Sequence, residues 1–595
     1  MFRIPLDGGP DPQRLALAST ALFLLLLSVP PAAGAQQSSE GEEDALFFET
    51  VEVNVVNVEV FITDKKGEPI TDLTREDFEV KSGGRPVEVT YFHKAVSEGR
   101  SASPQPLEEA PAEAALERLP VPDDQRLSLV LYIDNLAIRP SNRNAVFDAL
   151  RSFLQQSLRE EDQAMVVTYN GDLEVRHSFT HRLEDLLPTL AEIEKDGGRG
   201  VELDLDLSLL LEEMAASGGG PSGPVGSLVE PVQQASGSLE AVRAYAQKVN
   251  LRTRQSIRGV GLFLEQLAGL SGRKALLYVS DGLHLRPADA VLRAWQNRFG
   301  RDSLELQGGG LFSEMQDYDL TSDFERLGRL ANAEGVVLHT LDASRYQGNS
   351  SVAADAFSRR ADSLWAAELD GVQTLSLQAS LRIMAESTGG RALLRQADVG
   401  KALEGLTQDL GTYYSLGFEP IPGEKGFQKV HVEVRRKGLR VRHRDGYEIK
   451  TAEQKTAERA VAAALFKQAD NPLGVALEAG GDQPMDDGNF EVPVLVKIPL
   501  GQLVLVPQPE VHAGKVSLYL VAKDEKGRVS PVRRVSFPVR VPNKDLFTAL
   551  GQHISYTFKL QLRRGQQTVA VGVRDEVAAV TALQTLDLVL PGETG

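Results

Sequence analysis

Three aspartates each end a short run of apolar residues, and carboxylates placed in this way could bind a cation or a polar ligand. The runs are LSLVLYID at Leu127–Asp134, KALLYVSD at Lys274–Asp281 and GVVLHTLD at Gly335–Asp342. A nearly continuous apolar run of this length is typical of a strand that is buried on both faces of a sheet. In an open α/β sheet, ligands bind outside the carboxyl ends of the strands, where the loops converge. A single aspartate there can simply turn the chain out of its strand, but three at one edge favour a binding site.

The segments around these strands have the period of helices. In residues 141–158, the apolar residues with helical spacing are Val146, Leu150, Phe153, Leu154 and Leu158. Further strands are predicted at 163–169, 174–179 and 391–394, and further helices at 183–193, 203–214, 239–270, 324–333, 364–388 and 399–410. Residues 195–200 and 217–226 are predicted loops, and 282–319 is an extended insert without a predicted helix or strand. Repeated strand–helix units predict an α/β domain over residues 125–411, with a doubly wound, mostly parallel sheet.

Segments with alternating apolar and polar residues flank this domain and predict β structure on both sides of it. Residues 46–94 form a predicted N-terminal β module, and the residues 95–124, rich in Pro, Ala, Ser and Glu, form a predicted disordered linker. Residues 412–450 form a predicted β-hairpin extension. Residues 455–595 form a predicted C-terminal immunoglobulin-like β domain. The expected architecture is therefore an α/β domain between two β-sandwich-like modules.

Composition argues against several classes of function. At 595 residues, the chain is long enough for several domains. Its formal charge of −19 argues against a nucleic-acid partner, which requires a basic surface, and against anionic membrane surfaces. The chain has no cysteine, which rules out disulfides and thiol nucleophiles. It also lacks a Gly-x-Ser-x-Gly elbow and a Gly-Lys-Ser/Thr phosphate loop, so we predict no catalytic and no cofactor-binding residues.

The first 35 residues have the pattern of a secretory signal peptide. Arg3 and Arg14 precede the apolar run 15–29, and Ala33 and Ala35 supply small residues at the cleavage positions. The apolar run is short for a membrane span, so no transmembrane segment is expected after cleavage; an uncleaved anchor is the alternative. The mature protein is expected to be exported to the periplasm, to the cell envelope or out of the cell. An exported chain without cysteine fits a bacterial envelope protein.

Several of these features together resemble a known family. LSLVLYID at a strand end, the SDG of Ser280–Gly282 and the order of strands and helices resemble a von Willebrand factor A domain. The β module around 58–92 and the segment TYYSLGFEP to VRHRDGY at 412–447 resemble the von Willebrand factor A-related acidobacterial envelope proteins, so that the resemblance covers roughly residues 50–450. It implies a Rossmann-like domain that binds protein ligands through a metal-ion-dependent adhesion site.

The chain departs from the metal-binding motif of that family. The motif is Asp-x-Ser-x-Ser, in which a carboxylate and two hydroxyls hold Mg²⁺. Here Leu136 and Ile138 stand at the two hydroxyl positions after Asp134. The resemblance implies Asp134 and Asp281 as the metal ligands, and we add Asn135 and Asp342 to the expected ligand face. Without hydroxyl donors the site is degenerate, and Mg²⁺ is the one cofactor that the resemblance implies.

We therefore expect an exported, non-enzymatic binding or adhesion protein that presents a von Willebrand factor A-like face to a protein ligand. The face is expected to comprise residues 134–143, the 195–240 region, the 282–319 insert and Asp342. The alternative is a structural component of a bacterial envelope assembly, in which the β modules bind and the central domain is inert. A metal-dependent hydrolase is a more distant third reading. The sequence does not indicate the oligomeric state.

The signal-peptide assignment predicts that the mature chain begins at Gln36 and lies outside the cytoplasm, because the peptidase cleaves after the small residues at Ala33–Ala35. N-terminal sequencing of the native protein from fractionated cells checks both points. An intact Met1 on protein recovered from the soluble cytoplasmic fraction would contradict the assignment.

Overall fold

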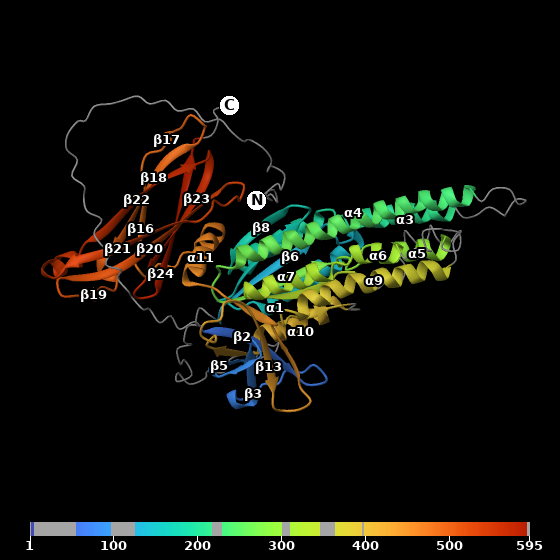
Figure 1. Ribbon diagram of the computed structural model, residues 1–595, viewed down its shortest axis with the longest axis horizontal. Coiled ribbons are helices and arrows are strands. Elements are labelled where there is room, and N and C mark those ends of the chain that lie inside the picture. The colour runs from blue at the N-terminus through green and yellow to red at the C-terminus, as the bar shows by residue number, and fades with distance from the viewer. Residues whose placement is uncertain are drawn as a thin grey trace, which may run out of the picture.

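The computed structural model describes residues 2–4, 55–96, 125–216, 229–299, 310–344, 363–394 and 398–591. Most of the predicted signal peptide at 1–35 and of the predicted linker at 95–124 lies outside the described residues, as does the predicted loop at 217–226. The described residues form a mixed α/β structure with several sheets (Figure 1). None of their helices is both long and apolar enough to cross a membrane.

The central sheet has seven strands in the order β1-β8-β7-β6-β9-β10-β11. The strands are β1 (Phe2–Ile4), β6 (Leu127–Asp134), β7 (Gln163–Tyr169), β8 (Leu173–Thr180), β9 (Arg273–Ser280), β10 (Val336–Asp342) and β11 (Ala392–Leu393). Strands β7, β6, β9, β10 and β11 are parallel, whereas β8 pairs antiparallel with β7 and with β1. The predicted strands of this domain are confirmed. Counted from β6, the strands stand in the order 3-2-1-4-5-6, which changes direction between β6 and β9.

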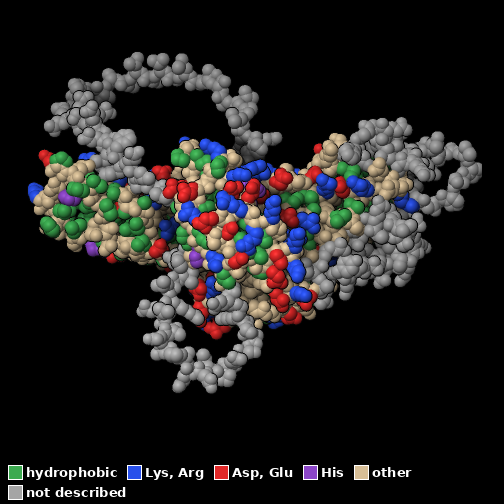
Figure 2. Space-filling view, turned by 90° about the horizontal axis from the view of Figure 1, so that it is seen from below, with side chains coloured by type: hydrophobic (Ala, Val, Ile, Leu, Met, Phe, Trp, Pro, Cys, Tyr) green, Lys and Arg blue, Asp and Glu red, His purple; other side chains and the backbone are tan. Residues whose placement is uncertain are grey.

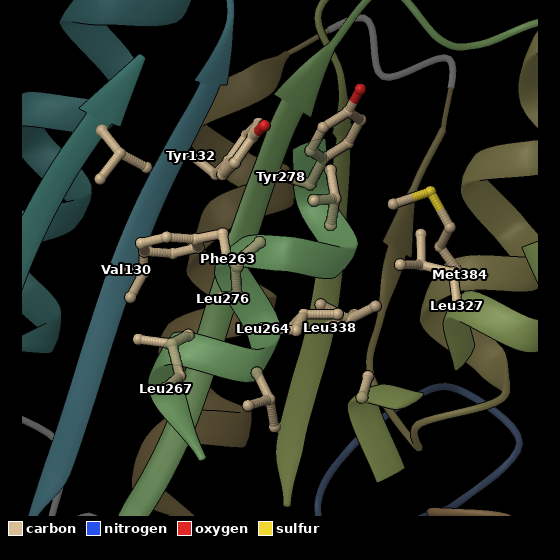
Figure 3. Packing of buried hydrophobic residues seen from close by; sticks show 14 of the residues in the cluster. Val130, Tyr132, Phe263, Leu264, Leu267, Leu276, Tyr278, Leu327, Leu338 and Met384 are labelled. Atoms are coloured by element: carbon tan, nitrogen blue, oxygen red, sulfur yellow. The ribbon is translucent and has the colours of Figure 1, made fainter. Parts of the chain in front are cut away.

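Helices cover both faces of this sheet, so β6 is buried along its whole length. Its residues alternate between two apolar clusters, with Val130 and Tyr132 in one and Leu129 and Leu131 in the other. The first cluster includes residues of α4 (Val229–Leu267), α7 (Thr321–Ala333) and α9 (Ser363–Glu386), and the second includes residues of α1 (Arg143–Ser157), α2 (Leu183–Lys195) and α10 (Val399–Gly411). Figure 3 shows Phe263 packing near Tyr132 in the first cluster. This two-sided core explains why the strand is a continuous apolar run.

Several helices extend together past the carboxyl edge of the sheet and share a core of their own (Figure 1). They are α3 (Val201–Ala216), α4, α5 (Asp289–Phe299), α6 (Gly310–Asp317) and α9. The indole nitrogen of Trp295 in this core donates to the Ser238 hydroxyl at 3.0 Å. No helix or strand was predicted in the 282–319 insert, and the structure places α5 and α6 there. Neighbouring residues 290–292 of α5 are all apolar and buried, which obscures the helical period in the sequence.

The β structure on either side of the α/β domain in the sequence forms a single unit in space. Its two sheets have the orders β14-β2-β12-β5 and β15-β13-β3-β4. The strands are β2 (Val56–Thr63), β3 (Phe78–Ser82), β4 (Arg85–Val87), β5 (Val89–Ala95), β12 (Tyr413–Phe418), β13 (Gly426–Val434), β14 (Arg440–His443) and β15 (Gly446–Ile449). The segments 46–94 and 412–450 were expected to be separate modules. They instead share one apolar core, because β12 lies between β2 and β5 and β13 pairs with β3.

The C-terminal domain consists of two antiparallel sheets around one apolar core. Its strands are β16 (Ala476–Ala479), β17 (Gln483–Pro484), β18 (Phe490–Pro499), β19 (Val506–Pro507), β20 (Val511–Asp524), β21 (Arg533–Pro542), β22 (His553–Leu562), β23 (Gly565–Asp575) and β24 (Val580–Leu590). Helix α11 (Ala452–Phe466) joins it to the α/β domain. One side of α11 packs on β20, β23 and β24, while Ala462 and Phe466 belong to the core of the α/β domain.

The turn that follows α4 packs on α11 and requires a residue without a side chain at Gly269, because a Cβ there would lie 2.0 Å from the Glu458 carbonyl oxygen. We therefore expect Gly269→Ala to force α11 away and to lower the free energy of unfolding by about 1–3 kcal/mol, the usual cost of overpacking. Chemical denaturation followed by circular dichroism measures this change. Gly371→Ala in α9 is the matched control, since a Cβ there meets nothing within 4 Å. It should be neutral or stabilise by up to about 1 kcal/mol. Equal stability of the two variants would contradict the tight α4–α11 contact.

Candidate ligand site at the carboxyl edge of the sheet

The three aspartates of the sequence analysis lie at the ends of three neighbouring strands. Strand β6 pairs with β9 up to Ile133 and Val279, and Asp342 of β10 is level with Ser280 of β9. Asp134 and Asp281 therefore follow the two strands between which the strand order reverses. In doubly wound sheets this switch point is where the loops part and a crevice opens.

Asp134 lies in the interior at this point and is held by the protein itself. Its side chain is fully buried, and it accepts hydrogen bonds from the Leu136 and Ala137 amides at 3.0 and 3.3 Å and from the Tyr278 hydroxyl at 2.5 Å. Burial raises the pKa of Asp134 to about 6, although the hydrogen bonds from Tyr278 and the two amides oppose that rise. The carboxylate thus closes the turn after β6 and has little capacity left for a ligand.

Asp281 is paired with an arginine. Its Oδ2 accepts from the backbone amide of Arg139 at 3.1 Å and from the Arg139 guanidinium at 3.3 Å. The other edge of that guanidinium donates to both carboxylate oxygens of Asp204 at 2.6 and 2.9 Å. Burial alone would lower the pKa of Arg139, but Asp204 and Asp281 raise it overall. A permanently charged guanidinium therefore lies between two carboxylates at the switch point.

Two glycines allow the loop before α3 to bring Asp204 to this place. A Cβ at Gly198 would lie 2.3 Å from the Ile138 carbonyl oxygen, and one at Gly200 would lie 2.5 Å from that of Ala137. The amide of Gly200 donates to the Ile138 carbonyl at 3.2 Å. Backbone therefore packs directly on backbone, which only glycine permits at these distances. Asp204 lies in the first turns of α3, which starts immediately after this contact.

These residues do not fit a Mg²⁺ site. Leu136 and Ile138, at the hydroxyl positions of the family motif, are 8% and 0% exposed. A cavity of about 50 Å³ borders Asp281, but Arg139 and Arg252 line it as well. Mg²⁺ prefers six oxygen ligands in octahedral geometry and would be repelled by these two cations. Within the described part of the chain, no three His, Asp or Glu side chains form a group that could hold a metal ion.

Asn135 and Asp342, which were expected on a ligand face, are 0% and 3% exposed. The amide oxygen of Asn135 accepts from Arg143 at 2.7 Å. One oxygen of Asp342 accepts from the Ser344 amide at 3.0 Å, and the other accepts from Gln378 at 3.4 Å. Both side chains order the loops that follow their strands. Both side chains are buried, and the expectation that they meet a ligand stays a prediction.

Sequence reasoning did not find Arg139 or Asp204. Arg139 directly follows the last position of the expected metal-binding motif. A positively charged side chain next to a predicted Mg²⁺ site was therefore a usable signal. Asp204 gave no comparable signal, because α3 also contains Glu202, Asp206, Glu212 and Glu213. Only the fold distinguishes the carboxylate that faces the site from the others.

Replacing Arg139 with methionine should leave Asp204 and Asp281 facing each other without a cation. Breaking a buried ion pair typically costs about 3–5 kcal/mol, and partial exposure of Arg139 and Asp204 favours the lower end. We expect a loss near 3 kcal/mol in the free energy of unfolding, measured by chemical denaturation. Arg254→Met is the control, because the Arg254 side chain is 47% exposed and its pair with Asp323 should contribute less than about 1 kcal/mol.

Titration of the unmodified protein with Mg²⁺ completes this test. No shift of the unfolding midpoint is expected, because Arg139 supplies the positive charge. Calorimetric binding of one Mg²⁺ below millimolar concentration, lost in Asp134→Ala, would contradict this account of the site.

Comparison with known proteins yields no match to a family model and no match to a curated protein. Among solved structures, the conserved hypothetical protein BatB from Bacteroides thetaiotaomicron aligns over 48% of this chain and 97% of its own, with 11% identity and a TM-score of 0.21. An aerotolerance-related membrane protein from Bacteroides fragilis aligns over 48% and 98%, with 10% identity and a TM-score of 0.21. The human COPII-coat protein Sec24c aligns over 79% and 44%, with 11% identity and a TM-score of 0.22. Likenesses this low carry no argument about family or function.

Proposed function

We propose that this chain is an exported, non-enzymatic binding protein of the bacterial envelope, whose von Willebrand factor A-like domain binds a protein partner without a divalent cation. The observation that carries the proposal is the guanidinium of Arg139 between Asp204 and Asp281 at the switch point of the sheet. In the family that the sequence resembles, a metal would organise this edge. Here an arginine of the same chain supplies the charge.

An exposed apolar face of α3 supports a protein as the partner. Val201, Leu205 and Leu209 recur every four residues along the helix and are 36%, 51% and 65% exposed. We call these three residues the α3 face. Leu251 of α4 and Leu375 of α9 are exposed as well. Exposed apolar groups are costly to keep in water, and a contiguous set is a common mark of a protein interface.

The α3 face is linked to the arginine bridge through α3 itself. Asp204, which binds Arg139, is next to Leu205 in the sequence, so the bridge fixes the start of the helix that displays the face. The ion pair thus holds the proposed contact surface in place.

The environment of Asp134 supports a non-enzymatic role. It is a carboxyl group with a pKa near neutrality, which is the usual property of a general acid or base. Its full burial and its hydrogen bond to Tyr278 leave no path for a reacting group to reach it. The raised pKa is accounted for by burial alone.

A second candidate function is a structural role in an envelope assembly, with the C-terminal domain as the binding part. Phe547 of α12 (Leu546–Ala549) is 91% exposed, and Leu550 and Val504 are 40% and 47% exposed. Gly501 lies against the Leu550 carbonyl, so the two segments that carry these residues are adjacent. In Figure 2 apolar side chains are prominent on the C-terminal domain at the left, whereas charged side chains crowd over the α/β domain.

Capture of a partner from an envelope extract by the full chain distinguishes the two candidates. We expect Leu205→Glu with Leu209→Glu to abolish capture, because two charges would replace the centre of the α3 face. Phe547→Glu is the matched control and should leave capture intact. All three residues are at least half exposed, so each change should alter the free energy of unfolding by less than about 0.5 kcal/mol. Chelation of divalent cations should have no effect.

The reverse pattern, with capture lost in Phe547→Glu and kept in the α3 variant, would favour the structural role. Capture that disappears on chelation would contradict the cation-independent site.

A further inference from the structure

A second cavity lies at the opposite edge of the central sheet, where β9 and β10 begin. Its volume is about 430 Å³, within the range of small-molecule sites. Three parts of the structure line it: the starts of β9 and β10, the β unit through Asn57 and Tyr447, and α11 through Glu458. We call it the junction cavity.

Positive charge prevails in the wall of the junction cavity. Six cationic side chains line it, namely Arg273, Lys274, Arg444, Lys450, Lys455 and Arg459, against four glutamates. This local excess of positive charge is opposite in sign to the formal charge of the whole chain, which is −19. Low-dielectric walls concentrate such a field inside a cavity.

Three of the four glutamates are already paired with cations. Glu59 pairs with Arg273 at 2.9 Å, and Lys450 pairs with both Glu334 and Glu458. Arg273 also stacks on Tyr413, with the guanidinium carbon 3.6 Å from the ring centre. These contacts join the parts of the structure around the cavity, and they neutralise three of the four glutamates in its wall.

Lys274 and Arg444 have no ion pair with a carboxylate within the part of the chain that the structure describes. Lys274 is 8% exposed, and its ammonium donates to the Leu267 and Ala268 carbonyls at 3.2 and 3.1 Å. Arg444 donates to the Asn57 carbonyl at 2.7 Å, and its Nε is buried without a hydrogen-bond partner among the described residues. A Cβ placed on Gly335 would lie 3.8 Å from both side chains, so the two cations flank the same point of the wall.

The pKa values of Lys274 and Arg444 agree with two cations that have no carboxylate partner among the described residues. Burial, together with the neighbouring Lys450 and Arg444, lowers the pKa of Lys274 to about 8 against the opposing effect of Glu334 and Glu458. Burial likewise lowers the pKa of Arg444 to about 10. An anion between them would offset both the desolvation and the mutual repulsion.

We propose that the junction cavity binds a small anionic ligand, carrying a carboxylate or a phosphate, with Lys274 and Arg444 as its charge partners. Apolar wall residues, among them Val56, Leu270 and Val336, suit a short hydrocarbon body attached to the anionic group. Because the wall is shared by the α/β domain, the β unit and α11, bound ligand would tie these parts together. The site is on the edge opposite to the α3 face and does not depend on the proposed function.

Isothermal titration of the full chain with sodium succinate and with sodium phosphate, at an ionic strength held constant with sodium chloride, tests the proposal. We expect saturable binding of at least one anion, and the anion that binds identifies the carboxylate or the phosphate as the favoured group. Arg444→Gln should weaken binding by about tenfold or more, as expected for loss of a charge-assisted hydrogen bond. Lys559→Gln is the control, because Lys559 is exposed on the C-terminal domain and should not affect binding.

Glu448→Gln provides a change of the opposite sign. Glu448 lines the cavity, so its neutralisation should tighten anion binding several-fold. This variant decides the question if Arg444→Gln fails to fold: tighter binding supports the proposal, and unchanged or weaker binding overturns it. Absence of saturable binding of both anions to the unmodified chain would also overturn it, as would unchanged affinity in folded Arg444→Gln.

Discussion

The carboxyl edge of the central sheet depends on one partly buried cation that the chain supplies itself. Arg139 follows β6, Asp281 follows β9 and Asp204 belongs to α3, so the bridge joins three segments that are far apart in the sequence. Removing charges from water costs several kcal/mol for each ion, and attraction offsets this only where the geometry is good. The bidentate contact with Asp204 and the two bonds to Asp281 meet that condition. This contact fixes the start of α3, while the apolar core shared with α4, α5 and α9 holds the rest of the helix.

The charged groups at the two edges of the sheet differ in whether the protein neutralises them. At the carboxyl edge, acidic groups are neutralised inside the protein by Arg139 and by backbone amides, which leaves little for a small ligand to bind. At the amino edge, Lys274 and Arg444 have carbonyl partners only, and the cavity beside them is roomy. The proposed protein contact and the proposed anion site thus lie at opposite ends of the same domain, and the charges that the fold leaves without an ion pair distinguish the two ends.

Much of the fold could be predicted from the sequence where local patterns carry the information. The bounds of β6 and β7 agree with prediction because strands buried on both faces give unbroken apolar runs between polar turns. The unity of the β module could not be predicted, since Tyr414 pairs with Val60 across the whole α/β domain and neither strand shows its partner. In the site, the aspartates were found because they end strands. The orientation of the neighbouring Asn135 could not be predicted, because a local motif does not show whether a side chain turns inward.

The two-part construction of the β unit has a consequence for how the chain acquires its structure. Apart from the β3–β4 pair, the strands of residues 56–95 find their sheet partners in residues 413–449, so the whole α/β domain is an insertion within this unit. During synthesis the first half must wait, with open strand edges, until some three hundred residues more have emerged. Closure of so long a loop is slow compared with the local strand–helix pairings of the inserted domain. The α/β domain is then the earlier part to fold, and its folding brings the two halves of the β unit within reach of each other.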